Sequence, residues 1–168
     1  MSVREIVVHP APVLRKKARK VTDFGAELQR LIDDMVETMR AAPGVGLAAP
    51  QVDVPLQVIV VEYAENEDAP PKLYTMVNPE IVRYSSEVES GTEGCLSIPG
   101  FVGDVERSVA VTVKGMNRRG QPMRVKAEGW LARIFQHEID HLNGVLFIDR
   151  AEKVWKLEEQ TSQVAPAD

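Results

Sequence analysis

The motif His137-Glu138-Ile139-Asp140-His141 constrains the fold of this 168-residue chain more than any other feature. Two histidines four residues apart lie on one face of a helix, so both imidazoles can reach one divalent metal ion, with Glu138 beside it. The helix is expected from about 129 to 142, and Asn143-Gly144 is a typical signal for its end. The fold must therefore bury this helix within reach of a further metal ligand.

Cys95 is the obvious third ligand, because it is the single cysteine of a chain that has three histidines. A closed structural zinc site takes four Cys or His ligands and would require His9 from the Pro-rich start of the chain. The alternative set of Cys95, His137 and His141 leaves one coordination position open. Water in such a position can have its pKa lowered from about 15.7 to about 7, so the set predicts a hydroxide nucleophile at neutral pH.

Glu138 is expected to act as general base and acid, since its carboxylate can take a proton from that water and return it to the leaving group. In the alternative interpretation Glu138 is an exposed carboxylate, and the two histidines only satisfy buried hydrogen bonds. Asp140 is expected to lie behind the metal ligands and support them or to form an ion pair, in either case without a chemical role.

Composition and charge exclude several classes of protein. Hydrophobic residues make up 44% of the chain and charged residues 27%, as in ordinary globular proteins. No stretch approaches the roughly 20 apolar residues of a membrane span, and the start of the chain lacks the apolar core of a signal peptide. The net charge of −5 disfavours nucleic-acid recognition, and the basic run 15–20 is interpreted as an exposed helix face. One cysteine without a partner fits a reducing cytoplasm.

The order of expected elements indicates an α+β fold, with antiparallel β-sheets packed around a central helix that carries the HExxH motif. A first long helix is indicated by apolar residues at steps of three and four, from Leu28 to Met39, and ends before Pro43. The segment 43–51 is expected to be a loop. Strands are expected at 56–63, 74–77, 81–84, 108–114, 122–127 and 145–148. Residues 1–150 are expected to form a single catalytic domain, followed by a short C-terminal helix (151–159) and tail within 151–168.

Three segments together carry a resemblance to a known family. They are Gly44-Val45-Gly46-Leu47-Ala48-Ala49-Pro50-Gln51, Glu93-Gly94-Cys95-Leu96-Ser97 and Gln136-His137-Glu138-Ile139-Asp140-His141. In these segments and their order, the chain resembles peptide deformylases, metal hydrolases that remove the N-formyl group from formylmethionine on nascent polypeptides. The similarity runs from about residue 9 to residue 149.

The resemblance implies a role for each matching position. Cys95, His137 and His141 would be the metal ligands and Glu138 the general acid and base. The Gln51 side chain and the Leu96 backbone N–H would donate hydrogen bonds to the oxyanion, a kind of contact worth about 3 kcal/mol. The backbone at Gly46 would meet the substrate chain, and apolar side chains would line the pocket for the formylmethionine side chain, namely Val45, Leu96 and Ile134.

The resemblance also implies a cofactor and partners. The metal is expected to be Fe²⁺, with Zn²⁺, Ni²⁺ or Co²⁺ as substitutes, and the substrates to be N-formylmethionyl peptides in the cytoplasm. Some members dock on the ribosome through a long basic C-terminal helix. Residues 152–160 are short and mixed in charge, so a transient ribosome contact at most is expected. The chain also lacks the basic residue that some members carry shortly after Pro99.

Two other functions compete with this one. HExxH is also typical of zincin-like metallopeptidases, but these usually take histidine or glutamate as third ligand, and a thiolate lowers the Lewis acidity of the metal. A metal-stabilised interaction module without catalysis is the second alternative, favoured by the small size of the chain.

Overall fold

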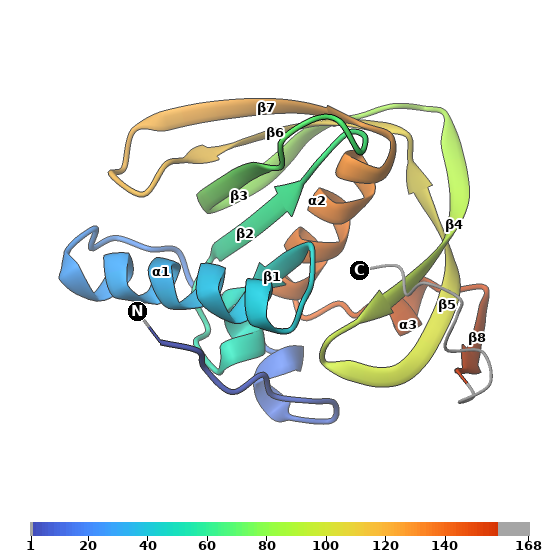
Figure 1. Ribbon diagram of the computed structural model, residues 1–168, viewed down its shortest axis with the longest axis horizontal. Coiled ribbons are helices and arrows are strands. Elements are labelled where there is room, and N and C mark those ends of the chain that lie inside the picture. The colour runs from blue at the N-terminus through green and yellow to red at the C-terminus, as the bar shows by residue number, and fades with distance from the viewer. Residues whose placement is uncertain (1, 158–168) are drawn as a thin grey trace.

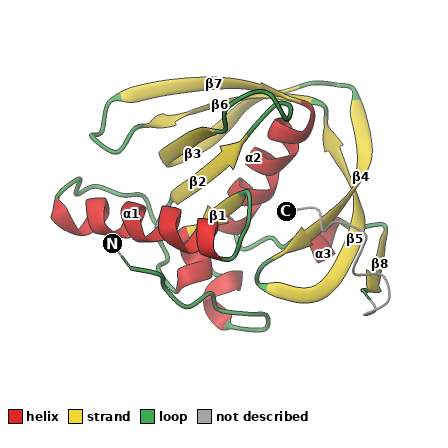
Figure 2. Cartoon of the chain, viewed as in Figure 1, coloured by secondary structure: helices red, strands yellow, loops and turns green. Residues whose placement is uncertain are grey.

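The computed structural model describes residues 2–157, which form two antiparallel sheets, three α-helices and two short 3₁₀ helices (Figures 1 and 2). The strands of the five-stranded sheet lie in the order β1-β2-β3-β6-β7, and those of the three-stranded sheet in the order β4-β5-β8. The strands are β1 Gly46–Ala48, β2 Val58–Tyr63, β3 Lys72–Tyr84, β4 Val88–Cys95, β5 Ile98–Ser108, β6 Ala110–Met116, β7 Pro122–Glu128 and β8 Lys153–Lys156. The helices are η1 Pro12–Arg15, α1 Ala26–Ala41, η2 Ala49–Val52, α2 Gly129–Leu142 and α3 Phe147–Arg150.

The five-stranded sheet is covered on both faces, which explains why β2 is an uninterrupted apolar run. Side chains alternate between the two faces of a strand. Ile59 and Val61 pack in one cluster with α2, and Val58 and Val60 pack in another with α1. Strand β2 therefore holds the two helices at a fixed separation across the sheet.

Helix α2 lies between the two sheets, so the expected α+β arrangement around a central helix is confirmed (Figure 1). Its observed bounds, Gly129–Leu142, agree with the range expected from the sequence. Gly144 follows with φ +75°, and a Cβ atom there would lie 2.6 Å from the carbonyl oxygen of Arg15. This position needs glycine, which is why the helix ends where the sequence indicates.

The long hairpin of β4 and β5 was not expected from the sequence. Its first strand, Val-Glu-Ser-Gly-Thr-Glu-Gly-Cys, is polar and mostly exposed, and it becomes buried only over its last three residues. Its partner pairs with it continuously from Val88 opposite Ser108 to Gly94 opposite Val102. Pairing with β5 stabilises this strand, and no local sequence pattern indicates that pairing.

Strand β3 was expected as two strands, and the structure shows one strand with an irregularity at its centre. The pairing with β6 shifts between Val77 and Glu80, and Asn78 has φ +53°. The Asn78 side chain accepts a hydrogen bond from the N–H of Val21 at 2.8 Å and donates one to its carbonyl oxygen at 3.1 Å. These bonds stabilise a backbone conformation that non-glycine residues rarely adopt.

The basic run 15–20 does not form the exposed helix that was expected. Arg15 ends η1, and the residues after it are non-helical. The Arg19 N–H donates to the Pro55 carbonyl at 2.9 Å, and the Gln57 N–H donates to the Arg19 carbonyl at 2.9 Å. Ala18 is buried in the cluster beneath α2. These backbone contacts with a distant loop outweigh the local helix preference.

Two expectations near the C-terminus are wrong. Residues 145–148 do not form a strand; Phe147 begins α3, and the Leu146 N–H donates to the Asp149 carboxylate at 2.9 Å, which caps the helix. In place of a helix over 151–159, Lys153–Lys156 form β8, paired with β5 from Asp104 to Phe101. Valine and tryptophan favour a strand once such an edge is available. The remainder of the expected helix and the tail, 158–168, lies outside the described residues.

Among residues 2–157, no helix is both long and apolar enough to cross a membrane.

Substitution of Phe135 tests the core that holds α2. It is fully buried and meets the Tyr74 ring edge-on, with centroids 5.4 Å apart. Phe135→Ala should lower the free energy of unfolding by about 3–5 kcal/mol, measured by urea denaturation. Tyr84→Ala, which removes a 59% exposed ring, should change it by less than about 0.5 kcal/mol. Equal losses in the two variants would contradict this account of the core.

Candidate metal centre

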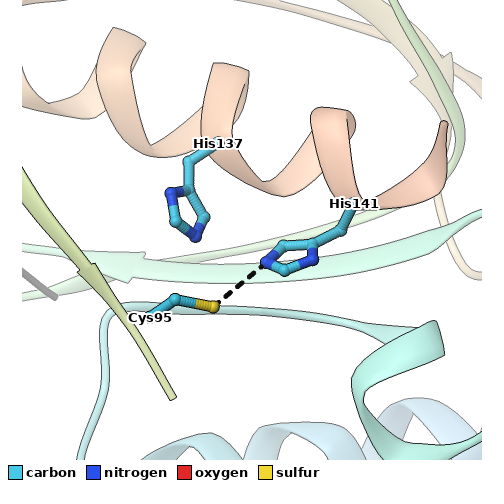
Figure 3. A group of neighbouring side chains, drawn as sticks. All are labelled: Cys95, His137 and His141. Carbon is cyan, nitrogen blue, oxygen red and sulfur yellow. Dashed lines mark hydrogen bonds between the residues drawn. The ribbon is translucent and has the colours of Figure 1, made fainter. Parts of the chain in front are cut away.

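Cys95, His137 and His141 converge on one point, as Figure 3 shows. One potential ligand atom from each residue lies within 4.8 Å of the others. The two histidines project from α2 toward Cys95 at the end of β4, where the thiol sulfur is 3.4 Å from Nε2 of His141. All three residues are buried. A sulfur and two imidazole nitrogens at this spacing fit a divalent transition metal.

The turn that joins β4 to β5 places the cysteine. Cys95 pairs with Ile98 after a register shift at Gly94, so Leu96 and Ser97 form the connection. The side chain of Cys95 packs in an apolar cluster with Ile98, Leu146 and Phe147. The thiol therefore has a fixed position against α2.

Glu93 holds the first histidine, a role that the sequence analysis did not assign. Its Oε1 lies 2.9 Å from Nδ1 of His137 and accepts a hydrogen bond from Arg107 Nη2 at 2.9 Å. Its Oε2 accepts from Arg107 Nε at 2.9 Å and from Arg133 Nη1 at 2.7 Å. Residues i and i+2 share one face of a strand, so the spacing of Glu93 and Cys95 was the available signal.

The charge of Glu93 is stabilised by these contacts. Burial opposes ionisation of the carboxyl, but hydrogen bonds from Arg107 and His137 outweigh it and hold the pKa of Glu93 well below its usual range. Ionised Glu93 accepts a hydrogen bond from Nδ1–H of His137, which leaves Nε2 directed at the metal position. A carboxylate behind a metal-binding imidazole raises the basicity of that ligand.

The two histidines differ in their surroundings. Burial disfavours charge on His137, but its pKa is raised because Cys95 and Glu93 both accept hydrogen bonds from it. Burial lowers the pKa of His141, and the neighbouring His137 lowers it further. Nδ1 of His141 has no hydrogen-bond partner within residues 2–157. Only one of the two imidazoles has the carboxylate support described above.

Glu138 lies against the backbone of β1. A Cβ atom on Gly46 would come within 2.5 Å of Oε2 of Glu138, so only glycine lets the carboxylate lie so close to the strand. Glu138 is 4% exposed. The segment expected as a loop at 43–51 contains β1 and η2, and this short strand brings Gly46 to the carboxylate.

Gln51 is held beside the cysteine by both ends of its amide. Its Oε1 accepts from the Ala48 N–H at 3.0 Å, and its Nε2 donates to Oγ of Ser97 at 3.1 Å. The same nitrogen lies 3.6 Å from the sulfur of Cys95. The structure thus brings Gln51 to the converging ligands, together with the backbone of Leu96, which follows Cys95 in the chain.

A small pocket opens beside the ligands. Its lining residues are Val45, Glu93, Gly94, Trp130, Arg133, Ile134, His137 and Glu138. Val45 and Ile134 therefore lie where the sequence analysis expected them, whereas Trp130 and Arg133 were not expected. The side chain of Leu96 is absent from this lining; it is partly buried in the cluster beneath α1. Its predicted contact with a substrate side chain does not follow from this arrangement.

The chain is similar to known proteins over almost its whole length. Residues 3–156 match the family model described as polypeptide deformylase. The peptide deformylase of Symbiobacterium thermophilum is 51% identical over 168 residues, which are 100% of this chain and 76% of that protein. The peptide deformylase of Natranaerobius thermophilus is 50% identical over 159 residues, which are 95% of this chain and 99% of that protein.

Solved structures agree with these sequence relatives. The peptide deformylase of Thermotoga maritima superposes with a TM-score of 0.83 at 43% identity and covers 91% of this chain and 100% of its own. A structure of the Acinetobacter baumannii enzyme described as bound to Met-Ala-Ser has a TM-score of 0.83 at 41% identity and covers 89% of this chain and 100% of its own. The arrangement of Cys95, His137, His141 and Glu138 lies within this shared fold, and the chain belongs to the peptide deformylase family of metal-dependent hydrolases.

Proposed function

We propose that the chain hydrolyses the N-formyl group of formylmethionine at the start of nascent polypeptides and releases formate. One observation carries the proposal: a buried thiol and two imidazoles converge beside a buried carboxylate that lies against a glycine backbone. This arrangement supports hydrolysis, whereas a purely structural metal site has no use for Glu138 in that position. The family assignment supports the same reaction.

The metal proposed for this site is a divalent ion bound by Cys95, His137 and His141, and ferrous iron is the ion that the family resemblance favours. Zinc, nickel and cobalt suit the same ligands and are expected to substitute. When bound, the ion would supply the Lewis acidity that lets water ionise near neutral pH.

Glu138 is the proposed general base and acid. Its carboxylate is placed to take a proton from the attacking water and to return it to the departing amine nitrogen. The contact with Gly46 limits where the carboxylate can move. Burial also removes competing solvent, so the proton stays between the carboxylate and the reacting atoms.

Gln51 and Leu96 are the proposed donors to the oxyanion. The Gln51 amide is already oriented by Ala48 and Ser97, so little reorganisation is needed when negative charge develops. The N–H of Leu96 follows directly after the ligand Cys95. Donor and ligand therefore share one short turn.

The pocket residues Val45 and Ile134 are the proposed contacts for the methionine side chain, with Trp130 as an addition from the structure. Strand β1 lies at the edge of its sheet, where an extended peptide can pair with the backbone at Gly46. The structure of the A. baumannii enzyme described as bound to Met-Ala-Ser supports the proposal that a fold of this kind binds a peptide. Rejection of acetyl groups requires a steric clash, because a methyl-sized difference is worth only about 1–3 kcal/mol.

We place the reaction in the cytoplasm, since nascent formylated chains arise there and a reducing environment protects a thiolate ligand. Any ribosome contact is proposed to be transient. A zincin-like peptidase remains the competing function, and release of formate rather than cleavage of internal peptide bonds separates the two.

Glu138→Gln should abolish turnover without removing the metal, because the amide keeps the shape of the side chain but cannot accept the proton. Formate release from formyl-Met-Ala-Ser should fall by at least about 100-fold, while elemental analysis should find the wild-type metal content. Glu80→Gln changes an exposed glutamate of β3 and should keep wild-type turnover. Full activity of Glu138→Gln would reject Glu138 as the general base, whereas a wild-type protein that releases no formate would favour the non-catalytic metal module.

Cys95→Ala should lose the metal, because two imidazoles alone hold a divalent ion weakly. Elemental analysis after gel filtration should show much less than the one ion per chain expected for the wild type. His9→Ala should keep the wild-type stoichiometry, since His9 is absent from the converging group. Loss of metal from His9→Ala would instead support the closed four-ligand site.

The iron-loaded protein should lose activity in air and keep it under anaerobic conditions, because oxygen oxidises both ferrous iron and a thiolate beside it. The nickel-loaded protein should show equal lifetimes in the two atmospheres. Equal lifetimes of the iron form would refute this expectation.

A further inference from the structure

A series of contacts between charged side chains runs outward from His137, away from the metal position. Glu93 contacts Nδ1 of His137, and Arg107 binds both oxygens of Glu93. The third nitrogen of Arg107, Nη1, donates to Oδ2 of Asp140 at 2.7 Å. Arg150 then donates to Asp140 through Nε at 2.6 Å and through Nη2 at 3.0 Å. This series of contacts ends at Arg150, the last residue of α3.

We propose that Asp140 is a positioning residue that acts through Arg107 and Glu93 to keep His137 in place as a metal ligand. From the sequence, Asp140 was expected either to support a metal ligand from behind or to form an ion pair, and the contacts of Arg107 favour the first of these roles. The inference rests on the metal site proposed above and adds to it a residue that does not touch the metal.

The guanidinium of Arg107 is held by two carboxylates. A guanidinium is planar, and Arg107 uses two edges of that plane, one for Glu93 and one for Asp140. Two anchors on different edges fix the plane, whereas Glu93 alone would leave it free to tilt. The side chain of Arg107 is 4% exposed, so few water molecules can reach it to replace a lost partner. Loss of Asp140 should therefore disturb the hold on Glu93.

The negative charge of Asp140 also acts on Glu93 through Arg107. Glu93 already receives two guanidinium groups, from Arg107 and Arg133. Asp140 offsets the positive charge of Arg107, so Glu93 keeps more of its strength as an acceptor for the His137 N–H. A stronger acceptor behind an imidazole makes that imidazole a better metal ligand. Neutralising Asp140 should therefore weaken metal binding by His137. The loss of geometric support for Arg107 should weaken it as well.

Arg150 explains how Asp140 keeps its own orientation. The Arg150 side chain is 50% exposed, whereas that of Asp140 is 14% exposed, so the pair lies at the boundary between solvent and the buried network. Oδ2 of Asp140 accepts hydrogen bonds from both Arg107 and Arg150, so the carboxylate links the two arginines. Asp140 lies three residues after His137 on the same helix, which places the direct ligand and its remote support on adjoining faces of α2.

The test uses the cobalt-loaded protein and its Asp140→Asn variant, which keeps the shape of the side chain and removes the charge. Excess chelator is added, and loss of the thiolate–cobalt absorption gives the rate of metal release. Release should be about 10-fold faster in Asp140→Asn, the lower end of the range seen when support behind a ligand is removed. The cobalt d–d bands should also change, because the geometry at His137 changes.

Asp149→Asn is the matched control. Asp149 also forms an ion pair near α3, but its partner is Arg15, outside the network of Glu93 and Arg107. The variant removes the same charge, so a general electrostatic effect would alter both release rates, whereas a positioning effect alters only that of Asp140→Asn. Equal release from the two variants would overturn the proposal, as would a lower melting temperature of Asp140→Asn with an unchanged release rate.

Arg107→Lys tests the path and also serves if Asp140→Asn does not fold. Lysine keeps the charge but loses the paired bonds to Glu93. It should also speed metal release, and the double variant should release metal no faster than Arg107→Lys alone. Additive effects would mean that Asp140 acts by another route. A wild-type protein that binds no cobalt would reject the metal site itself, a failure distinct from that of the positioning role.

Discussion

The hydrogen bond between Glu93 and His137 is the interaction on which the metal centre depends. It joins the hairpin of the three-stranded sheet to the helix that carries two of the ligands. A buried carboxylate is costly unless it is paired and hydrogen-bonded. Arg107 and Arg133 satisfy that requirement. The position of His137 beside Cys95 and His141 therefore depends on a cluster of four side chains from two strands and one helix, namely Glu93, Arg107, Arg133 and His137.

This requirement explains the architecture around α2. An apolar helix face could pack on the five-stranded sheet alone, as the cluster around Phe135 and Met76 does. The polar side of the helix needs a second sheet that carries its counter-charges. Strands β4 and β5 supply Glu93 and Arg107, whereas the rest of β4 is polar because it is mostly exposed. The fold thus separates a hydrophobic contact that stabilises the helix from an ionic contact that orients its ligands.

Close backbone approach is the other recurring constraint. Gly46 lets Glu138 lie against β1, and Gly91 lets Arg133 cross β4, where a Cβ would come within 2.8 Å of the guanidinium carbon. In both places a missing side chain provides room for a charged group that acts in the centre. These two glycines are therefore part of the candidate site and not features of turns.

The sequence by itself determined the elements whose signals are local. Helix α2 and its end at Gly144, the apolar run of β2 and the candidate ligand set of Cys95 and the two histidines all follow from periodicity, turn residues and the few residues able to bind a metal. Only the tertiary structure decided the features that depend on distant partners. Strands β4 and β8 form because an edge is present to pair with, and residues 16–20 stay extended because a distant loop binds their backbone. Glu93 and Asp140 acquire their places because Arg107 reaches both, and no spacing along one strand or helix specifies which distant arginine folds between two carboxylates.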